Sequence, residues 1–287
     1  MPQAELNPMQ LGAPVQVIAV TGGKGGTGKT SVAVNLATAL AQMGRKTMLL
    51  DGDLGLANVD VLLGLTPRYT LEHVLKGERT LEEVILRTSS GVRVVPASSG
   101  VARMATLTPS EQSGIVQAFG TLPGTLHVLI IDTAAGIGEP VLQFCQAAQQ
   151  VLVVLRDEPT SLTDTYALIK LLSRDRGLHQ FRVVTNLTRH ADQGEMAFRR
   201  LQRVTDRYLQ VVLDHVADIP EDFSLQKSVQ AQRPVLEAFP TSPASKAFKG
   251  LARVANQWPM PAGPSGRIEF FMERLLTRPE PRLKVLK

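Results

Sequence analysis

The chain has 287 residues, of which 44% are hydrophobic, and a formal net charge of +5 at pH 7. This length and composition exclude a disordered chain and are sufficient for one large domain with an appendage. The longest apolar runs are too short for a membrane-spanning helix, and residues 1–14 lack the basic start and apolar stretch of a secretory signal. We therefore expect a cytoplasmic protein.

Cysteine and histidine usage gives no sign of a transition-metal site. Cys145 is the only cysteine and lies in an apolar stretch, so we interpret it as a buried hydrophobic residue. The five histidines are scattered without the spacing of metal ligands. The mild positive charge is typical of a solvated surface, so we expect no specific nucleic-acid binding.

The predicted elements alternate between strands and helices along the chain. Residues 15–21 form a short β-branched run that ends in glycines, and residues 31–43 carry apolar side chains at helical spacing. Thr80 with Glu83 and Thr108 with Glu111 fit capping boxes at two helix starts. Further strands are predicted at 47–50, 92–95, 128–131, 151–155 and 183–184, and further helices at 161–172, 196–204 and 242–258. The alternation predicts an α/β fold with a mostly parallel, twisted sheet and helices on both faces.

The chain divides into four parts. A flexible segment at 1–14 precedes the main domain at 15–258, and the Pro- and Gly-rich residues 259–266 form a linker. Residues 267–287 are predicted to form an amphipathic helix and a basic tail. Its apolar stripe consists of Ile268, Phe271, Met272, Leu275 and Leu276. The pattern alone fits a membrane surface and the protein's own core equally well.

A P-loop pattern lies between the first predicted strand and the helix that follows it. Backbone N–H groups of such a loop face the phosphates of a nucleotide, Lys29 can neutralise their β and γ oxygens, and Thr30 can ligate Mg²⁺. No Asn-Lys-x-Asp guanine motif occurs, so the expected cofactors are ATP and Mg²⁺. The predicted binding residues are Gly23, Lys24, Gly25, Gly26, Thr27, Gly28, Lys29, Thr30 and Ser31.

Three aspartates follow predicted strands, at the edge where ligands gather in parallel sheets. Asp51 and Asp53 come after the strand at 47–50, and Asp132 comes after the strand at 128–131. ATP hydrolysis needs carboxylates that hold Mg²⁺ and orient a water molecule toward the γ-phosphate. A turn or helix-cap role is the alternative for each aspartate.

The second lysine of the P-loop, Lys24, makes the motif resemble the deviant Walker A motif of the MinD/ParA ATPases. This resemblance implies a MinD-like P-loop NTPase fold and an ATP-bound homodimer in which Lys24 reaches the nucleotide of the partner subunit. It also implies that Asp53 orients the attacking water, that Asp51 supports the Mg²⁺ shell and that Asp132 holds Mg²⁺ through water. The catalytic residues would then be Asp53, Lys24 and Lys29.

The same resemblance implies residues that contact the base. Asn186 directly follows a predicted strand, and it matches the family position whose side-chain amide recognises adenine. A loop asparagine without a ligand is the alternative. The loop that packs on the base would consist of Pro220, Glu221 and Asp222.

Within this family the chain is similar to the FleN/FlhG regulators of flagellar number, from about residue 15 to its end. The similar segments begin at Val17, Asp53, Asp132 and Asp157. The similarity implies an ATP-dependent dimerising switch that antagonises a flagellar master transcriptional activator of the FleQ type and that slow hydrolysis resets. Many FlhG proteins stimulate the GTPase FlhF through an Asp-Gln-Ala-x-x-Leu-Arg segment, of which only Gln3 and Ala4 are present here.

Relatives of this kind use a C-terminal amphipathic helix to bind membranes in the presence of ATP. The resemblance therefore implies that the stripe at 268–276 binds reversibly to the inner face of the cytoplasmic membrane. The alternative function is a ParA-like positioning ATPase that binds DNA non-specifically through a basic face of the dimer. A scaffold that binds ATP without hydrolysing it also fits the pattern, whereas iron–sulfur carrier ATPases of this fold need paired cysteines.

Overall fold

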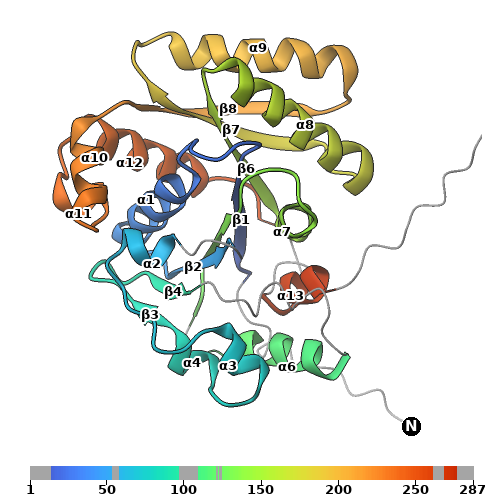
Figure 1. The fold of residues 1–287 in the computed structure, drawn as a ribbon, viewed down its shortest axis with the longest axis vertical. Helices are drawn as coiled ribbons and strands as arrows, with labels where there is room; N and C mark the ends of the chain where they lie inside the picture. The colour runs from blue at the N-terminus through green and yellow to red at the C-terminus, as the bar shows by residue number, and fades with distance from the viewer. Residues whose placement is uncertain are drawn as a thin grey trace, which may run out of the picture.

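The computed structural model describes residues 14–53, 58–96, 109–120, 122, 125–260 and 268–276. These residues form an eight-stranded sheet in the order β3-β4-β2-β5-β1-β6-β7-β8. Every neighbouring pair is parallel except β3–β4, which is antiparallel. Helices lie on both sides of the sheet (Figure 1), which confirms the α/β fold expected from the alternating pattern.

The elements follow one another along the described parts of the chain with short connections. The strands are β1 (Gln16–Thr21), β2 (Thr47–Gly52), β3 (Leu86–Arg87), β4 (Arg93–Val95), β5 (Val128–Thr133), β6 (Gln150–Arg156), β7 (Gln180–Thr188) and β8 (Val212–Pro220). The first helices are α1 (Lys29–Gln42), α2 (Val59–Leu62), α3 (Leu71–Leu75), α4 (Leu81–Val84), α6 (Pro109–Gly120) and α7 (Glu139–Ala147). The others are α8 (Pro159–Arg176), α9 (Gln193–Tyr208), α10 (Phe223–Gln230), α11 (Val235–Ala238), α12 (Pro243–Ala255) and α13 (Ile268–Leu276).

The sheet separates two hydrophobic cores, because successive side chains of a strand point to opposite faces. In β1, Val17 and Ala19 belong to the core that includes buried residues of α6, α7, α8, α9 and α13. Ile18 and Val20 belong to the opposite core, which includes buried residues of α1, α11 and α12. Both faces of the central strands are thus covered, and their carboxyl ends remain available for a ligand site.

Several predicted boundaries agree with the structure. Thr80 caps α4 in a capping box, in which its backbone N–H donates to Glu83 Oε2 over 2.8 Å. Ser242 caps α12 and accepts from the N–H of Ser245 over 3.2 Å. Of the second predicted capping box, Thr108 and the Glu111 side chain lie outside the described residues. Cys145 is fully buried as expected, and burial raises the pKa of its thiol to about 12.

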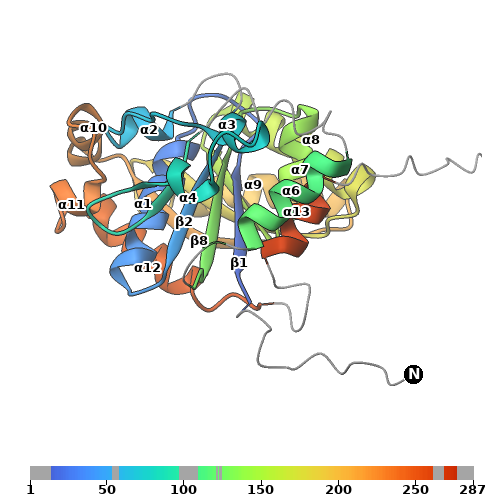
Figure 2. The same cartoon turned by 90° about the horizontal axis from the view of Figure 1, so that it is seen from below.

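The C-terminal helix α13 packs on the protein's own core. Ile268, Phe271, Met272 and Leu275 are at most 8% exposed, and the helix contacts α6 and α7. Figures 1 and 2 both show α13 beside α6. The described part of the apolar stripe therefore faces the core in this structure. Membrane binding would require the same side chains to face outward. The Leu276 side chain lies outside the described residues.

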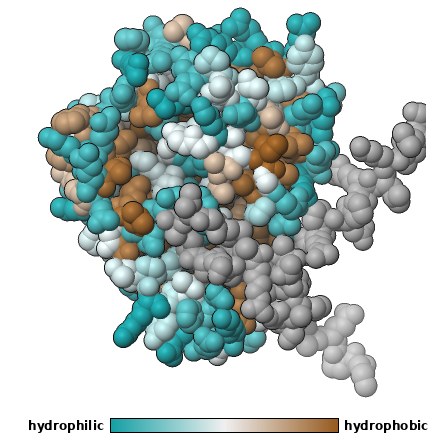
Figure 3. All heavy atoms as spheres, in the orientation of Figure 1, coloured by the Kyte–Doolittle hydropathy of each residue, from teal (hydrophilic) through white to brown (hydrophobic). Residues whose placement is uncertain are grey.

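The surface of the protein offers no extended apolar band in the view of Figure 3. Hydrophilic side chains cover most of that face, and the apolar side chains lie in separate groups. Among the helices in the described ranges, none is long and apolar enough to span a membrane.

Candidate nucleotide-binding site

The P-loop connects β1 to α1 and ends at the first turn of that helix. Gly26 and Gly28 have φ angles of 76° and 89°, a left-handed backbone conformation that favours glycine. Gly23 lies against α8, where an added Cβ would be 2.2 Å from the backbone carbonyl carbon of Asp164. The loop can therefore curl tightly beneath α8 and direct backbone N–H groups toward a ligand at the N-terminus of α1.

Lys29 is held inside the loop. It is 8% exposed, and its Nζ donates to the backbone oxygen of Lys24 over 3.2 Å. Burial lowers the pKa of Lys29, and this effect is partly opposed by the carboxylates of Asp132 and Asp53. The structure thus brings the predicted phosphate-binding lysine close to two of the predicted carboxylates. A positive group beside carboxylates suits a nucleoside triphosphate that is bound together with Mg²⁺.

Asp132 lies at the end of β5, next to Asp51 of β2 in the sheet register. It is 1% exposed and is hydrogen-bonded to the side chain of Thr30, whereas its Oδ1 has no hydrogen-bond partner among the described residues. The pKa of Asp132 is raised to about 7, chiefly by burial and also by Asp51 and Asp53, against the effects of Thr30 and Lys29. A buried carboxylate oxygen without a donor, beside a threonine hydroxyl, fits the predicted Mg²⁺ site.

This site would need additional ligands to complete a magnesium shell. The described residues contain no cluster of three or more His, Cys, Asp or Glu side chains that could hold a metal ion by themselves. Magnesium in phosphate-binding sites retains several waters and uses substrate oxygens, so one hydroxyl and one or two carboxylates are sufficient protein ligands. The residues present therefore fit Mg²⁺ together with a nucleotide.

Asp51 is held by backbone N–H groups from both sides of residues 54–57. It is fully buried, and its oxygens accept backbone N–H groups of Asp53 (3.0 Å), Asn58 (3.2 Å) and Val59 (3.3 Å). Burial raises the pKa of Asp51 to about 6, although these backbone hydrogen bonds oppose the shift. Asp51 thus fixes the chain on either side of residues 54–57 and sets the position of Asp53; its support of Mg²⁺ remains a prediction.

Lys24 is directed toward its own chain. Its Nζ donates to Thr160 Oγ1 over 2.9 Å and lies 3.7 Å from Glu158 Oε2, at the start of α8. Arg156 pairs with the same carboxylate over 3.0 Å. The Lys24 side chain is 41% exposed. The contact across a dimer stays a prediction, and it requires Lys24 to leave Thr160 and Glu158. No sequence pattern had indicated these two residues as partners of Lys24 within its own chain.

Asn186 and the loop at 220–222 lie close to the P-loop. Asn186 donates from Nδ2 to the backbone oxygen of Thr27 over 2.8 Å. The Glu221 N–H donates to the Thr188 backbone oxygen over 2.8 Å, which places the loop beside the end of β7. The structure therefore brings these parts of the predicted base site to one edge, although they are far apart in the sequence.

Both oxygens of Asp222 are used within the fold, and the contact of its loop with the base stays a prediction. Its Oδ1 caps α10 by accepting from the Ser224 N–H over 2.8 Å, and its Oδ2 accepts from the Ala244 N–H over 2.9 Å. Glu221 pairs with Arg189 over 2.7 Å. These contacts determine the conformation of the loop at 220–222.

Ser31 is the last of the predicted phosphate-binding residues. Its buried hydroxyl has no hydrogen-bond partner in the described part of the chain, which fits its predicted place beside a phosphate.

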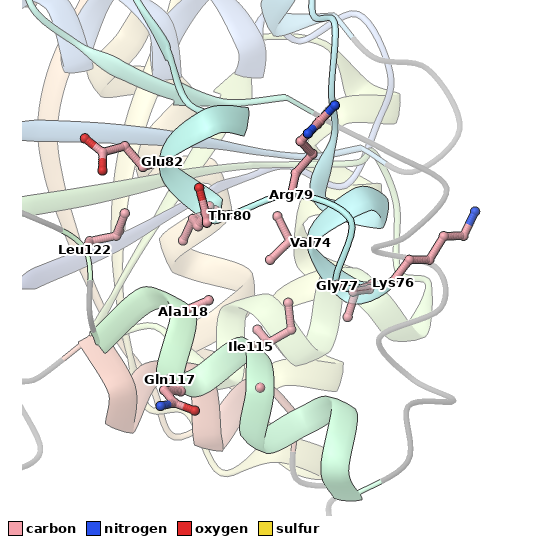
Figure 4. A pocket seen from close by; sticks show the side chains of 13 residues that line it. Val74, Lys76, Gly77, Arg79, Thr80, Glu82, Ile115, Gln117, Ala118 and Leu122 are labelled. Carbon is pink, nitrogen blue, oxygen red and sulfur yellow. The ribbon is translucent and has the colours of Figure 1, made fainter.

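A cavity of about 660 Å³ lies elsewhere, between the α3–α4 region and α6 (Figure 4). Its lining includes Val74, Arg79, Thr80, Ile115 and Leu122, and none of the predicted nucleotide-binding residues. Arg79 is already engaged, because it lies over the Tyr69 ring and pairs with Glu83. The candidate site therefore rests on the P-loop and the carboxyl ends of the strands, and not on this cavity.

Comparisons with known proteins agree with this geometry. Residues 14–255 match the ParA family model, described as "NUBPL iron-transfer P-loop NTPase". The chain is 56% identical over 272 residues to the antiactivator FleN of Pseudomonas aeruginosa, covering 94% of this chain and 97% of that one. It is 32% identical over 220 residues to the flagellum site-determining protein YlxH of Helicobacter pylori, with 76% and 74% covered.

A solved structure shows the same fold. The septum site-determining protein MinD of Pyrococcus horikoshii, complexed with Mg-ADP, matches with a TM-score of 0.66 and 26% identity, covering 85% of this chain and 96% of that one. The family model, the sequence relatives and the fold therefore lead to one assignment. The chain belongs to the ParA/MinD family of P-loop NTPases.

Proposed function

We propose that this protein is an ATP-dependent switch that regulates flagellar number or placement. The observation that carries the proposal is the 56% identity to the antiactivator FleN over almost the full length of both chains. Binding of Mg-ATP would drive formation of a homodimer, and the dimer would antagonise a transcriptional activator of the FleQ type. Slow hydrolysis would then return the protein to the monomer, so the reaction serves as a timer.

The residues of the site can carry out this cycle. The backbone N–H groups at the start of α1 and Lys29 bind the phosphates, and Thr30 with Asp132 would hold Mg²⁺, which neutralises charge on the phosphate oxygens when it is bound. Asp53, positioned by its N–H bond to Asp51, orients the attacking water. Asn186 offers the adenine amino group a buried oxygen that has no hydrogen-bond partner within the described ranges.

Size measurements in different nucleotide states test the switch directly. We expect light scattering to show a monomer without nucleotide or with ADP, and a mass about twice as large with Mg-ATP. Lys24→Ala should remain monomeric with ATP, because the lysine no longer reaches the partner's nucleotide. A mass that is the same in all three states would contradict the proposed cycle. ATP-dependent retention of duplex DNA at moderate salt would instead favour the ParA-like alternative.

Interaction with other flagellar proteins has unequal support. The similarity to an antiactivator supports an activator as the partner. An interaction with the GTPase FlhF has no comparable support, because only Gln3 and Ala4 of the stimulating segment occur in the sequence; both lie outside the described residues.

We also propose that α13 leaves the core to bind the inner face of the cytoplasmic membrane. Its stripe is buried here, so membrane binding and core packing compete for the same side chains. Exposure of a large apolar side chain costs roughly 1.5–3 kcal/mol, and a lipid interface returns most of that cost. Two helices in a dimer bind far more tightly than one, which would make membrane binding depend on ATP.

Removal of the C-terminal segment tests this part of the cycle. We expect deletion of residues 266–287 to abolish sedimentation with anionic liposomes in the presence of ATP. Phe271→Ser serves as a second variant, because it retains the segment and removes one aromatic side chain that is 2% exposed. Both variants are to be compared with the intact protein in ADP. If the truncated protein sediments with ATP as the intact one does, α13 is not the membrane anchor.

A further inference from the structure

Asn186 has two ends with different surroundings. It lies on β7 and is 3% exposed. Its amide nitrogen donates to the Thr27 backbone oxygen in the P-loop, over 2.8 Å. Its amide oxygen, in contrast, is buried and has no hydrogen-bond partner among the described residues. An asparagine that only read the base would not need the first of these contacts.

The contact with Thr27 determines the orientation of a whole peptide unit. The Thr27 C=O and the Gly28 N–H belong to one planar trans peptide, so they point in opposite directions. When Asn186 holds the carbonyl, the Gly28 N–H is fixed on the opposite side of the peptide. Gly28 immediately precedes α1, where backbone N–H groups bind phosphate. A hydrogen bond accepted by the carbonyl also polarises this N–H and strengthens it as a donor.

The close packing of Asn186 against the Thr27–Gly28 peptide also requires a glycine at position 28. An added Cβ on Gly28 would be 2.3 Å from Asn186 Nδ2, so only glycine allows the amide to lie against the loop. The Thr27 side chain is 2% exposed, and its hydroxyl donates to the Lys24 backbone oxygen over 3.4 Å. The peptide is thus braced from within the loop and, through Asn186, from β7.

We propose that Asn186 is a positioning residue that holds the phosphate-binding loop in shape through the Thr27 carbonyl and so couples adenine recognition to phosphate binding. The adenine amino group, once bound at the free oxygen, would hold the amide in the orientation that grips the loop. This inference rests on the proposed function for the identity of the nucleotide. Its consequence is that the loop should depend on Asn186 even for a ligand that has no base.

Magnesium tripolyphosphate is such a ligand, and its affinity can be measured by competition with a fluorescent ADP analogue. We expect Asn186→Ala to bind tripolyphosphate about five- to tenfold more weakly than the wild type, the effect of losing one neutral buried hydrogen bond. ATP should lose more affinity, because both ends of the amide are removed. In steady-state ATP hydrolysis, kcat should fall and KM should rise, since the phosphates are held less accurately.

Two further variants make the result decisive. Asn186→Leu has the same number of side-chain heavy atoms and no hydrogen-bonding groups, so it should reproduce the effect of Asn186→Ala without a cavity. Asn256→Ala, at the exposed end of α12, is the matched control and should leave both affinities unchanged. Thermal melts without nucleotide show whether each variant is folded.

Failure of this inference differs from failure of the proposed function. If Asn186→Ala and Asn186→Leu weaken ATP but bind tripolyphosphate as the wild type does, Asn186 reads the base only and the positioning role is wrong. If the wild type binds neither ATP nor tripolyphosphate, the nucleotide switch itself is wrong.

Discussion

Replacing Asp53 with alanine is expected to lower ATP hydrolysis by about 10²- to 10⁴-fold, the usual contribution of a group that positions or deprotonates the attacking water. The side chain is partly exposed and lies within electrostatic range of Lys29 and Asp132. Its backbone N–H is tied to Asp51 over 3.0 Å, so the substitution leaves the course of the chain unchanged. Nucleotide binding and dimerisation should persist, because removal of a negative charge beside the phosphates does not weaken them.

Phosphate release and light scattering, measured on the same sample, separate these effects. The Asp53→Ala protein should form a dimer with ATP that persists for longer than the wild-type dimer. Asp60→Ala is the matched control, because Asp60 is a carboxylate on α2 that bonds the neighbouring Val61 N–H. An unchanged rate of phosphate release in Asp53→Ala would remove the role assigned to this residue and favour another water-orienting group.

Local patterns in the sequence predicted the frame of this site. The glycine spacing of the P-loop and the apolar alternation around it are short-range features, so they indicated the strand, the loop and α1 directly. Asp51 and Asp132 could be assigned to one edge because the carboxyl ends of parallel strands meet there. The register that pairs them confirms this reasoning.

Long-range side-chain contacts could not be predicted in the same way. Asn186 and Thr27 are 159 residues apart, and only the fold brings the amide to the loop. Lys24 meets Thr160 across 136 residues, and Asp222 accepts from Ala244. The stripe of α13 was equally compatible with lipid and with protein, because both environments favour apolar side chains. The partner that α6 and α7 provide is visible only in the folded chain.

The buried Asp132 carboxylate is expected to destabilise the nucleotide-free protein at neutral and alkaline pH. A pKa of about 7 in the fold, against 3.8 in the unfolded chain, corresponds to roughly 4 kcal/mol at pH values above 7. Because the folded state binds the proton more tightly, the stability is greatest below the unfolded pKa and is lost as the pH rises to 7. Acidification from pH 8 to 5 should therefore stabilise the wild type without nucleotide.

Asp132→Asn should be more stable than the wild type at pH 8 by a few kcal/mol, because the amide keeps the shape and an acceptor for Thr30 without the buried charge. Urea unfolding at pH 8, 7, 6 and 5 measures this difference, which should shrink toward pH 5 as wild-type Asp132 takes up its proton. Asp51, whose pKa is about 6, titrates in both proteins, so the comparison reports the titration of Asp132 together with its coupling to Asp51. The variant should also lose the extra stabilisation that Mg²⁺ adds to ATP, because the open carboxylate oxygen has gone. A variant that is less stable than the wild type at pH 8, or that responds to Mg-ATP as the wild type does, would show that Asp132 is a structural residue and not the magnesium site.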